Sequence, residues 1–289
     1  MAILVIGGTG QIGSAVVAQL ARHDVEVIAL GTKTPATGLP ASARLVIGDV
    51  LDVDFMRGLL RTVSTVFFLN PGVPDELARG LLVAGLVEEA GIKGFVYLSM
   101  IGADRFVDSS RAAAKLATEH SIARRHLPAT ILRPNALFQN DLLLRDAIVR
   151  DHRYSTPLGD IGLTMIDLGD LAEVAAAELI RRERAPEPLP AETIDVVGPE
   201  LFSGEAIAAL WSDVLGERVA YAGDDLDAVE QAMRAAMPAA SAYDLRLVFE
   251  GILREGGTGA LGAASRLERL LGRPLRHYRS FAEEMARSF

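Results

Sequence analysis

Three glycines near the start of the chain, Gly7, Gly10 and Gly13, follow a short apolar run and precede apolar residues at helical spacing. Glycines let the backbone turn sharply and come close to a phosphate, and the free N–H groups at the start of a helix favour negative charge. Strand, glycine turn and helix in this order are typical of a site for the pyrophosphate of a dinucleotide. The spacing is G-x-x-G-x-x-G, however, not the standard G-x-G-x-x-G. A tight strand-to-helix turn without a ligand is the alternative.

The elements around this turn are predicted to alternate between strand and helix. Apolar and β-branched runs predict strands at 2–6, 25–30, 44–47, 63–69, 95–98 and 129–132. Apolar residues at helical spacing predict one helix after the glycines and others at 52–61, 75–90 and 109–126. Repeated strand–helix–strand order predicts an α/β fold, a Rossmann-type doubly wound parallel sheet with right-handed crossovers. Ligands of such sheets bind beyond the carboxyl ends of the strands.

The second half of the chain has a different pattern and is predicted to form a smaller, mostly helical substrate lobe. Residues 1–134 would be the dinucleotide-binding core, and 135–289 a discontinuous lobe from which 168–197 packs back on the core. The connector 183–190 carries three prolines and cannot continue the helix before it. The elements expected here are a loop and helix at 135–150, helices at 168–182, 203–215, 226–237, 243–254 and 281–287, strands at 193–197 and 219–221, and a flexible glycine-rich break at 255–259.

Composition narrows the class of protein. Half of the 289 residues are apolar, which allows a sizeable core. A net charge of −9 without a basic run argues against nucleic acid and anionic membranes as partners. The absence of cysteine excludes disulfides and thiolate catalysis, and the five histidines lack metal-site spacing, so no metal is expected. No apolar segment reaches the roughly 18–20 residues that cross a bilayer, and the glycine motif begins too early for a signal peptide. A cytoplasmic monomer or homodimer is expected.

Several separate motifs resemble those of one family. They are Leu4–Gly13, Gly48–Val50, Phe67–Pro71, Val96–Ser99, Lys115 with Glu119, Thr130–Asn135 and Asp167–Ala172. Together they cover about residues 2–180 and resemble the NmrA-like group of atypical short-chain dehydrogenases/reductases. The C-terminal part matches only in general style. The resemblance implies a nicotinamide dinucleotide as cofactor and a small organic molecule as substrate.

The resemblance also implies roles for residues at the strand ends. Asp49 and Val50 would flank the adenine, where a carboxylate can accept a hydrogen bond from the exocyclic amine; a turn or helix-cap aspartate is the alternative. The residues expected at the cofactor are Gly7, Thr9, Gly10, Gln11, Ile12, Gly13, Thr32, Lys33, Asp49, Val50, Leu69, Asn70, Pro71, Lys115, Pro134 and Asn135. Met100, Phe138 and Met165 are expected to line the substrate pocket, although such residues are also common in a core.

The end of the second predicted strand bears on the choice of cofactor. NAD-specific proteins usually carry an acid there, which accepts from the ribose hydroxyls. This chain has Leu30-Gly31-Thr32-Lys33-Thr34, without an acid. Lys33 and the threonine hydroxyls could bind a 2′-phosphate, so NADP(H) is favoured over NAD(H). A solvated loop lysine is the alternative for Lys33.

Lys115 and Ser99 are the candidate catalytic residues. Ordinary short-chain dehydrogenases use Tyr-x-x-x-Lys, in which the tyrosine moves a proton. Lys115 fits the lysine position, but Arg111 stands where the tyrosine would be. Lys115 would then hydrogen-bond the nicotinamide ribose, with Glu119 one helical turn on holding it. Ser99 stands where ordinary members place a substrate-facing serine, although a strand-end cap is the alternative.

Hydride transfer needs no protein acid when the substrate itself delocalises the charge. The sequence therefore favours an NAD(P)H-dependent reductase of a small conjugated or electron-poor substrate of the quinone, azo, imine or enone type. Water, Ser99 or the cofactor ribose would supply a proton. A non-catalytic sensor of the dinucleotide is the second reading, because the missing tyrosine permits both. An epimerase is a third, although epimerases normally need the tyrosine.

Overall fold

The computed structural model describes residues 2–34, 38–70 and 72–287 of the chain. The described residues form two compact units. The first draws on Met1–Met100, Ala114–Arg133 and Gly169–Ile194, and the second on Ile101–Ala113, Pro134–Leu168 and Asp195–Phe289.

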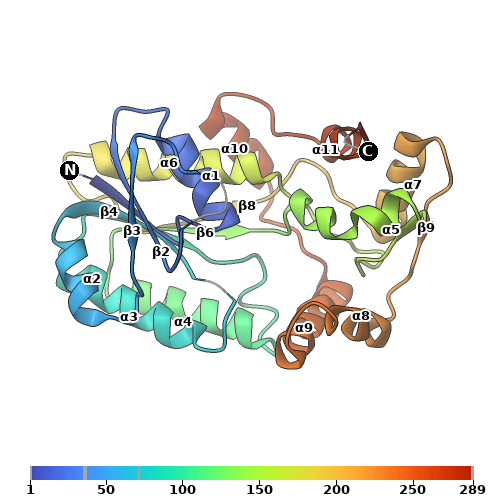
Figure 1. Ribbon diagram of the computed structural model, residues 1–289, viewed down its shortest axis with the longest axis horizontal. Helices are drawn as coiled ribbons and strands as arrows, with labels where there is room; N and C mark the ends of the chain where they lie inside the picture. Colours follow the sequence, from blue (N-terminus) through green and yellow to red (C-terminus); the bar gives the residue numbers. More distant parts are fainter. Residues whose placement is uncertain (1, 35–37, 71, 288–289) are drawn as a thin grey trace. The chain divides into compact units, whose positions relative to one another are not determined.

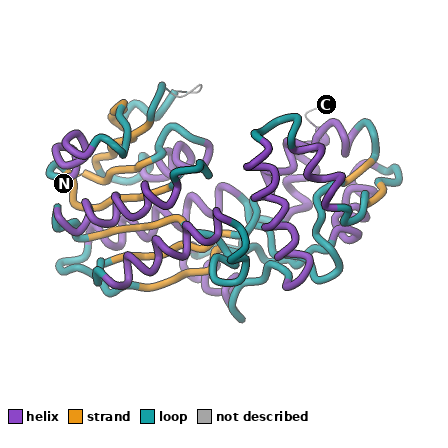
Figure 2. Tube along the Cα trace, turned by 90° about the horizontal axis from the view of Figure 1, so that it is seen from below, coloured by secondary structure: helices purple, strands orange, loops and turns teal. Residues whose placement is uncertain are grey.

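The first unit is built on a seven-stranded sheet with the strand order β3-β2-β1-β4-β5-β6-β8. The neighbouring strands from β3 to β6 pair in parallel. Figure 2 shows the strands of the sheet, in orange, running side by side. The order of the strands reverses at β1, which lies between β2 and β4, and this is the point at which open α/β sheets bind their ligands. The strands are β1 (Ala2–Ile6), β2 (Glu26–Gly31), β3 (Ala43–Ile47), β4 (Val63–Leu69), β5 (Gly94–Leu98), β6 (Ala129–Pro134) and β8 (Glu192–Val196).

Helices cover both faces of this sheet, which is why its central strands are apolar along their whole length. In Figure 1, α2 (Val53–Leu60), α3 (Glu76–Glu89) and α4 (Ser110–Arg124) lie on one face. The other face carries α1 (Gln11–Leu20) and α6 (Leu168–Arg184). All five residues of β1 are buried. Aromatic rings stabilise the layer between sheet and helices, with Phe68 and Tyr97 stacked at a centroid distance of 5.7 Å.

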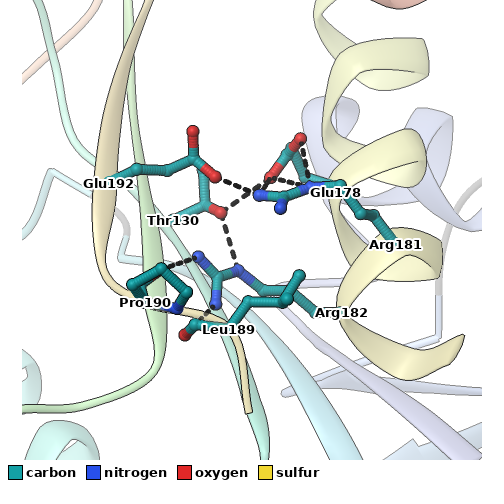
Figure 3. A network of polar contacts seen from close by, with 7 residues as sticks. All are labelled: Thr130, Glu178, Arg181, Arg182, Leu189, Pro190 and Glu192. Atoms are coloured by element: carbon teal, nitrogen blue, oxygen red, sulfur yellow. Dashed lines mark hydrogen bonds and ion pairs between the residues drawn. The ribbon is translucent and has the colours of Figure 1, made fainter. Parts of the chain in front are cut away.

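A polar network fixes the segment between α6 and β8, as Figure 3 shows. Arg182 is fully buried, and its guanidinium donates to the hydroxyl of Thr130 and to the carbonyls of Leu189 and Pro190. Next to it, Glu178 accepts from Thr130 at 2.8 Å and pairs with Arg181. The proline-rich connector is therefore anchored to the sheet through its own backbone.

The second unit is mostly helical. Its elements are the 3₁₀ helix η1 (Phe138–Leu144), α5 (Arg145–Val149), β7 (Arg153–Tyr154), α7 (Gly204–Leu215), β9 (Ala220–Tyr221), α8 (Leu226–Met233), α9 (Ala239–Glu255), α10 (Ala263–Leu271) and α11 (Tyr278–Arg287). Its core holds a buried polar chain, in which Trp211 donates to the Tyr278 hydroxyl and Tyr278 donates to Asp141. No helix among the described residues is both long and apolar enough to cross a membrane.

The expected α/β fold is confirmed, and the strands of the sheet begin and end within two residues of the predicted bounds. The helix expected at 226–237 ends at Met233 and is followed by hydrogen-bonded turns as far as Met237, since Pro238 disfavours helical backbone at the residue before it. The helix α10 was not predicted, although two glycines in left-handed conformation, Gly262 and Gly272, bound it. The expected flexible break at 255–259 is wrong at Gly257, whose N–H and carbonyl both bond to the strand-like segment 162–164.

Candidate functional site

The glycine turn after β1 crosses the carboxyl end of the sheet. Gly7 adopts a left-handed conformation with φ of 82°, which favours glycine. The N–H groups of Gly7 and Gly8 both donate to the carbonyl of Leu30 at the end of β2, at 3.0 and 2.9 Å. The turn is thereby tied to the neighbouring strand, and Gly10 directly precedes α1.

The glycines of this turn are required for different reasons. A Cβ at Gly13 would lie closer than 3.0 Å to the carbonyl of Gly7, so the fold itself requires glycine there. At Gly10 the φ of −86° suits any residue, and the nearest atom to an added Cβ is 3.5 Å away. Gly10 is exposed. Nothing in the described chain requires glycine at this position, whereas a pyrophosphate lying against the backbone would.

The start of α1 matches this interpretation. Its N-cap residue makes no side-chain capping bond, and no acidic residue occupies the first turn. Gln11 is exposed and Ile12 is half-buried. The first N–H groups and the helix dipole are therefore available to an anion. The residues of the turn fit the phosphates of a dinucleotide.

The predicted adenosine end of the site lies after β2 and β3. Thr9 packs against Gly31, where an added Cβ would lie closer than 3.0 Å to the threonine side chain. Thr32 and Lys33 follow and are exposed. Asp49 accepts from the N–H of Leu51 at 3.0 Å and pairs with Arg79 at 2.9 Å. The Leu51 N–H lowers the pKa of Asp49, and Arg79 lowers it further.

Of the other residues predicted at the cofactor, Val50 packs in the apolar core with Met56. Leu69 ends β4 next to Gly7, with its carbonyl 3.2 Å from the place of a Cβ there. Asn70 is buried, and its side-chain N–H group donates to the carbonyl of Glu76 at the start of α3. Pro71 lies outside the described residues. Asn70 thus joins the end of β4 to α3.

Lys115 contacts a carboxylate that the sequence pattern did not indicate. Its Nζ lies 3.0 Å from Oε1 of Glu76, 3.3 Å from the carbonyl of Leu98, and 5.8 Å from the ring centre of Tyr97. Sequence reasoning expected Glu119 to hold Lys115 because the two are four residues apart on one helix. Both side chains do face the sheet, but Glu76 comes from α3, which the spacing within α4 cannot reveal.

Glu119 lies instead at the end of β6, where it pairs with Arg133. Arg133 Nε and Nη2 donate to the two carboxylate oxygens at 3.0 and 2.6 Å. The hydroxyl of Ser99, the first residue after β5, donates to the same carboxylate. Ser99 and Glu119 are both buried. Sequence reasoning identified Ser99 and Glu119 but missed Arg133 as their partner.

The remaining predicted residues lie at Met100 and within the second unit. Met100, next to Ser99, is half-buried. The half-buried Pro134 ends β6, and the amide of Asn135 is held by Gly257 and Ala136. Met165 is buried, as is Phe138, whose ring packs edge-on against Tyr278 at 5.2 Å.

Arg111, which the sequence resemblance places where ordinary members have a tyrosine, pairs with a residue of its own unit. Its Nε lies 3.6 Å from Asp244 of α9. Asp244 also accepts from the backbone N–H of Ser110 at 2.6 Å, so it caps the start of α4. The side chain at position 111 is therefore held by an ion pair with Asp244.

The sheet order and the glycine turn at the reversal point define a Rossmann-type α/β protein. Residues 1–254 match the NmrA-like family, and the chain belongs to this family, as the motifs indicated.

Known relatives extend over nearly the whole chain. An NAD(P)H azoreductase from Xenophilus azovorans is 29% identical over 293 residues, which is 99% of each chain. Two solved structures share the fold at 21% identity: the triphenylmethane reductase of Citrobacter sp. (TM-score 0.82, 99% of this chain and 100% of that chain) and an NADPH-dependent quinone oxidoreductase of Escherichia coli (TM-score 0.81, 99% of both). NAD(P)H-dependent reductases are thus distant relatives of this chain.

Proposed function

We propose that this protein is an NAD(P)H-dependent reductase of small, conjugated, electron-poor organic molecules. The observation that carries the proposal is that the fold does not require glycine at Gly10, in a turn whose other glycines the fold itself requires. It coincides with an uncapped helix N-terminus at the reversal point of the sheet. Two of the relatives named above, the azoreductase and the quinone oxidoreductase, act with NAD(P)H and NADPH.

NADPH is the proposed cofactor. No aspartate or glutamate occurs between Glu26 and Asp49, so no acid of this stretch would repel a 2′-phosphate. Lys33 is exposed just beyond the end of β2 and would pair with that phosphate. When bound, the dinucleotide supplies a hydride to the substrate.

The side chains at the ends of β5 and β6 suit orientation better than proton donation. Lys115 Nζ lies 3.0 Å from Glu76 and has donors for a ribose hydroxyl. In this proposal its task is to position the cofactor. No phenol stands at position 111 to serve as an acid, so the substrate must stabilise the added electron pair itself. Quinones, azo compounds and cationic dyes or imines do so.

A substrate panel tests this proposal. Purified protein is titrated with NADPH and NADH by calorimetry and then incubated with quinones, azo dyes, triphenylmethane dyes and imines, with NADPH oxidation followed at its absorbance. Tight NADPH binding with reduction of at least one class supports the reductase. Binding without any reduction favours the dinucleotide sensor, and absence of binding overturns the proposal.

A further inference from the structure

Ser99 is held in place from three directions. Its backbone N–H donates to the carbonyl of Leu132 in β6 at 2.8 Å. The carbonyl of the preceding residue, Leu98, accepts from Lys115. Its hydroxyl donates to Glu119. The side chain is buried, so both its position and its rotamer are determined by these neighbours.

The direction of the hydrogen bond between Ser99 and Glu119 follows from the ion pair that Glu119 forms with Arg133. Both carboxylate oxygens accept from Arg133 in a bidentate ion pair. An ionised carboxylate only accepts hydrogen bonds, so the proton of the bond must come from Ser99. The hydroxyl of Ser99 therefore has no second proton to donate, and only its lone pairs remain for another group.

We propose that Ser99 is a hydrogen-bond acceptor toward the bound ligand, and that Glu119 and Arg133 are positioning residues that impose this polarity. Ser99 follows β5 at the carboxyl edge of the sheet, where the ligand of such a fold binds. The matching ligand group is an N–H or O–H donor, either the carboxamide of a nicotinamide or a donor on the substrate. The inference rests on the proposed function. It excludes Ser99 as the donor of the proton that the reduced substrate takes up.

A second cluster of one hydroxyl, one carboxylate and one arginine lies at the opposite end of β6 and provides a matched control. Glu178 is buried, accepts from the hydroxyl of Thr130, and is gripped by Nε and Nη2 of Arg181. Figure 3 shows this second cluster. Thr130 stands near the amino end of β6 and Arg133 near its carboxyl end. Because the amino edge is not where ligands bind, the Glu178 cluster serves the fold alone.

The test is a double-mutant cycle on Ser99→Ala and Glu119→Gln, with Glu178→Gln as the control. Glu119→Gln leaves one acceptor oxygen in place of two, so it removes both the bidentate pair with Arg133 and the negative charge that fixes the polarity of the Ser99 hydroxyl. We expect each single variant to lose about three- to tenfold in ligand affinity or kcat/KM. The double variant should be no more than about twofold worse than Ser99→Ala, because coupled effects do not add. Glu178→Gln should lose thermal stability while its kinetics stay within twofold of wild type.

Two readouts distinguish the sources of the donor group. Coupling in the NADPH dissociation constant, measured by calorimetry without turnover, assigns the donor to the carboxamide. Coupling in the substrate KM alone assigns it to the substrate. Independent, multiplying effects in both readouts, or a Glu119→Gln variant that behaves like Glu178→Gln, would overturn the inference. A wild-type protein that binds no NADPH instead overturns the proposed function, and this is seen before any variant is made.

Discussion

Lys115 Nζ and Glu76 Oε1 lie 3.0 Å apart, with only 9% and 5% of the two side chains exposed. A buried charge without its partner is costly, whereas the intact pair is close to neutral in its effect on stability. The pair therefore fixes a cation at the carboxyl end of β5 while adding no net charge to the site. Because Lys115 pairs with Glu76 and is also proposed to bind the cofactor, its effect on stability and its effect on cofactor affinity can be measured separately.

Lys115→Met is expected to lower the free energy of unfolding by about 3–5 kcal/mol, because it removes the cation that lies 3.0 Å from the buried carboxylate of Glu76. Adding Glu76→Gln should restore much of this stability, while NADPH affinity stays reduced, since the donor to the ribose is still missing. Chemical denaturation and calorimetry measure the two effects. The same double exchange at the exposed Arg57–Glu89 pair should change neither quantity.

The turnover of the Lys115→Met variant distinguishes a lysine that positions the cofactor from one that transfers a proton. If it only positions the cofactor, Lys115→Met should raise the KM for NADPH and lower kcat by well under the roughly 10²–10⁴-fold typical of a lost general acid or base. A collapse of kcat with NADPH affinity intact would show instead that this lysine moves a proton.

Gly10→Val and Gly13→Ala are expected to fail in different ways. At Gly10 the backbone is extended and an added Cβ meets no atom closer than 3.5 Å, so the variant should fold. Its NADPH affinity should fall by more than about tenfold, because the side chain occupies the path of the pyrophosphate. Gly13→Ala should lose stability by about 1–3 kcal/mol or more through its clash with the carbonyl of Gly7. Unchanged NADPH affinity in a folded Gly10→Val protein would contradict the proposed site.

Lys33→Ala is expected to reduce the preference for NADPH over NADH by about tenfold or more, through loss of a charge-assisted contact with the 2′-phosphate. NADH affinity should stay the same. Arg44→Ala is the control, because Arg44 is also exposed but pairs in register with Ile28, earlier along β2. If the ratio is the same in wild type and Lys33→Ala, another group reads the phosphate.

Asp141 predicts a pH dependence of stability. Burial raises its pKa to about 7, although the hydrogen bond from Tyr278 lowers it in part. The folded protein thus binds a proton that the unfolded chain releases near pH 4, so the unfolding free energy falls as the pH rises from about 4 through 7. Asp141→Asn imitates the protonated form and can still accept from Tyr278.

Above pH 7 the Asp141→Asn variant should exceed wild type in stability by about 1–3 kcal/mol, and the difference should shrink toward pH 5. Denaturant titrations at pH 5, 6, 7 and 8 measure it. Asp54→Asn, at a side chain that is 97% exposed, should leave the pH profile as it is in wild type. A wild-type stability that stays flat between pH 5 and 8 would show that Asp141 titrates normally.

The sequence predicted those parts of the site that are local along the chain. The turn from Gly7 to Gly13 is set by neighbouring residues, and its strand and helix are recognisable by their periodicity. The partners of Lys115 and Glu119 were not predictable in this way. Helical spacing suggests a pair between the two, but both face a crowded sheet edge, where Glu76 from α3 and Arg133 from β6 approach more closely. Tertiary neighbours of this kind leave no mark in the spacing.

The connector between α6 and β8 has a consequence for digestion and for protein engineering. Polar residues and three prolines would mark 183–190 as a natural cutting or insertion point. Its backbone is nevertheless bound by Arg182 at Leu189 and Pro190 and by Lys93 at Ala185. Proteases need an unpaired, extended stretch of backbone, so limited digestion should spare this connector. New termini or inserted tags placed here would disturb the hydrogen bonds that Arg182 and Lys93 make to this segment.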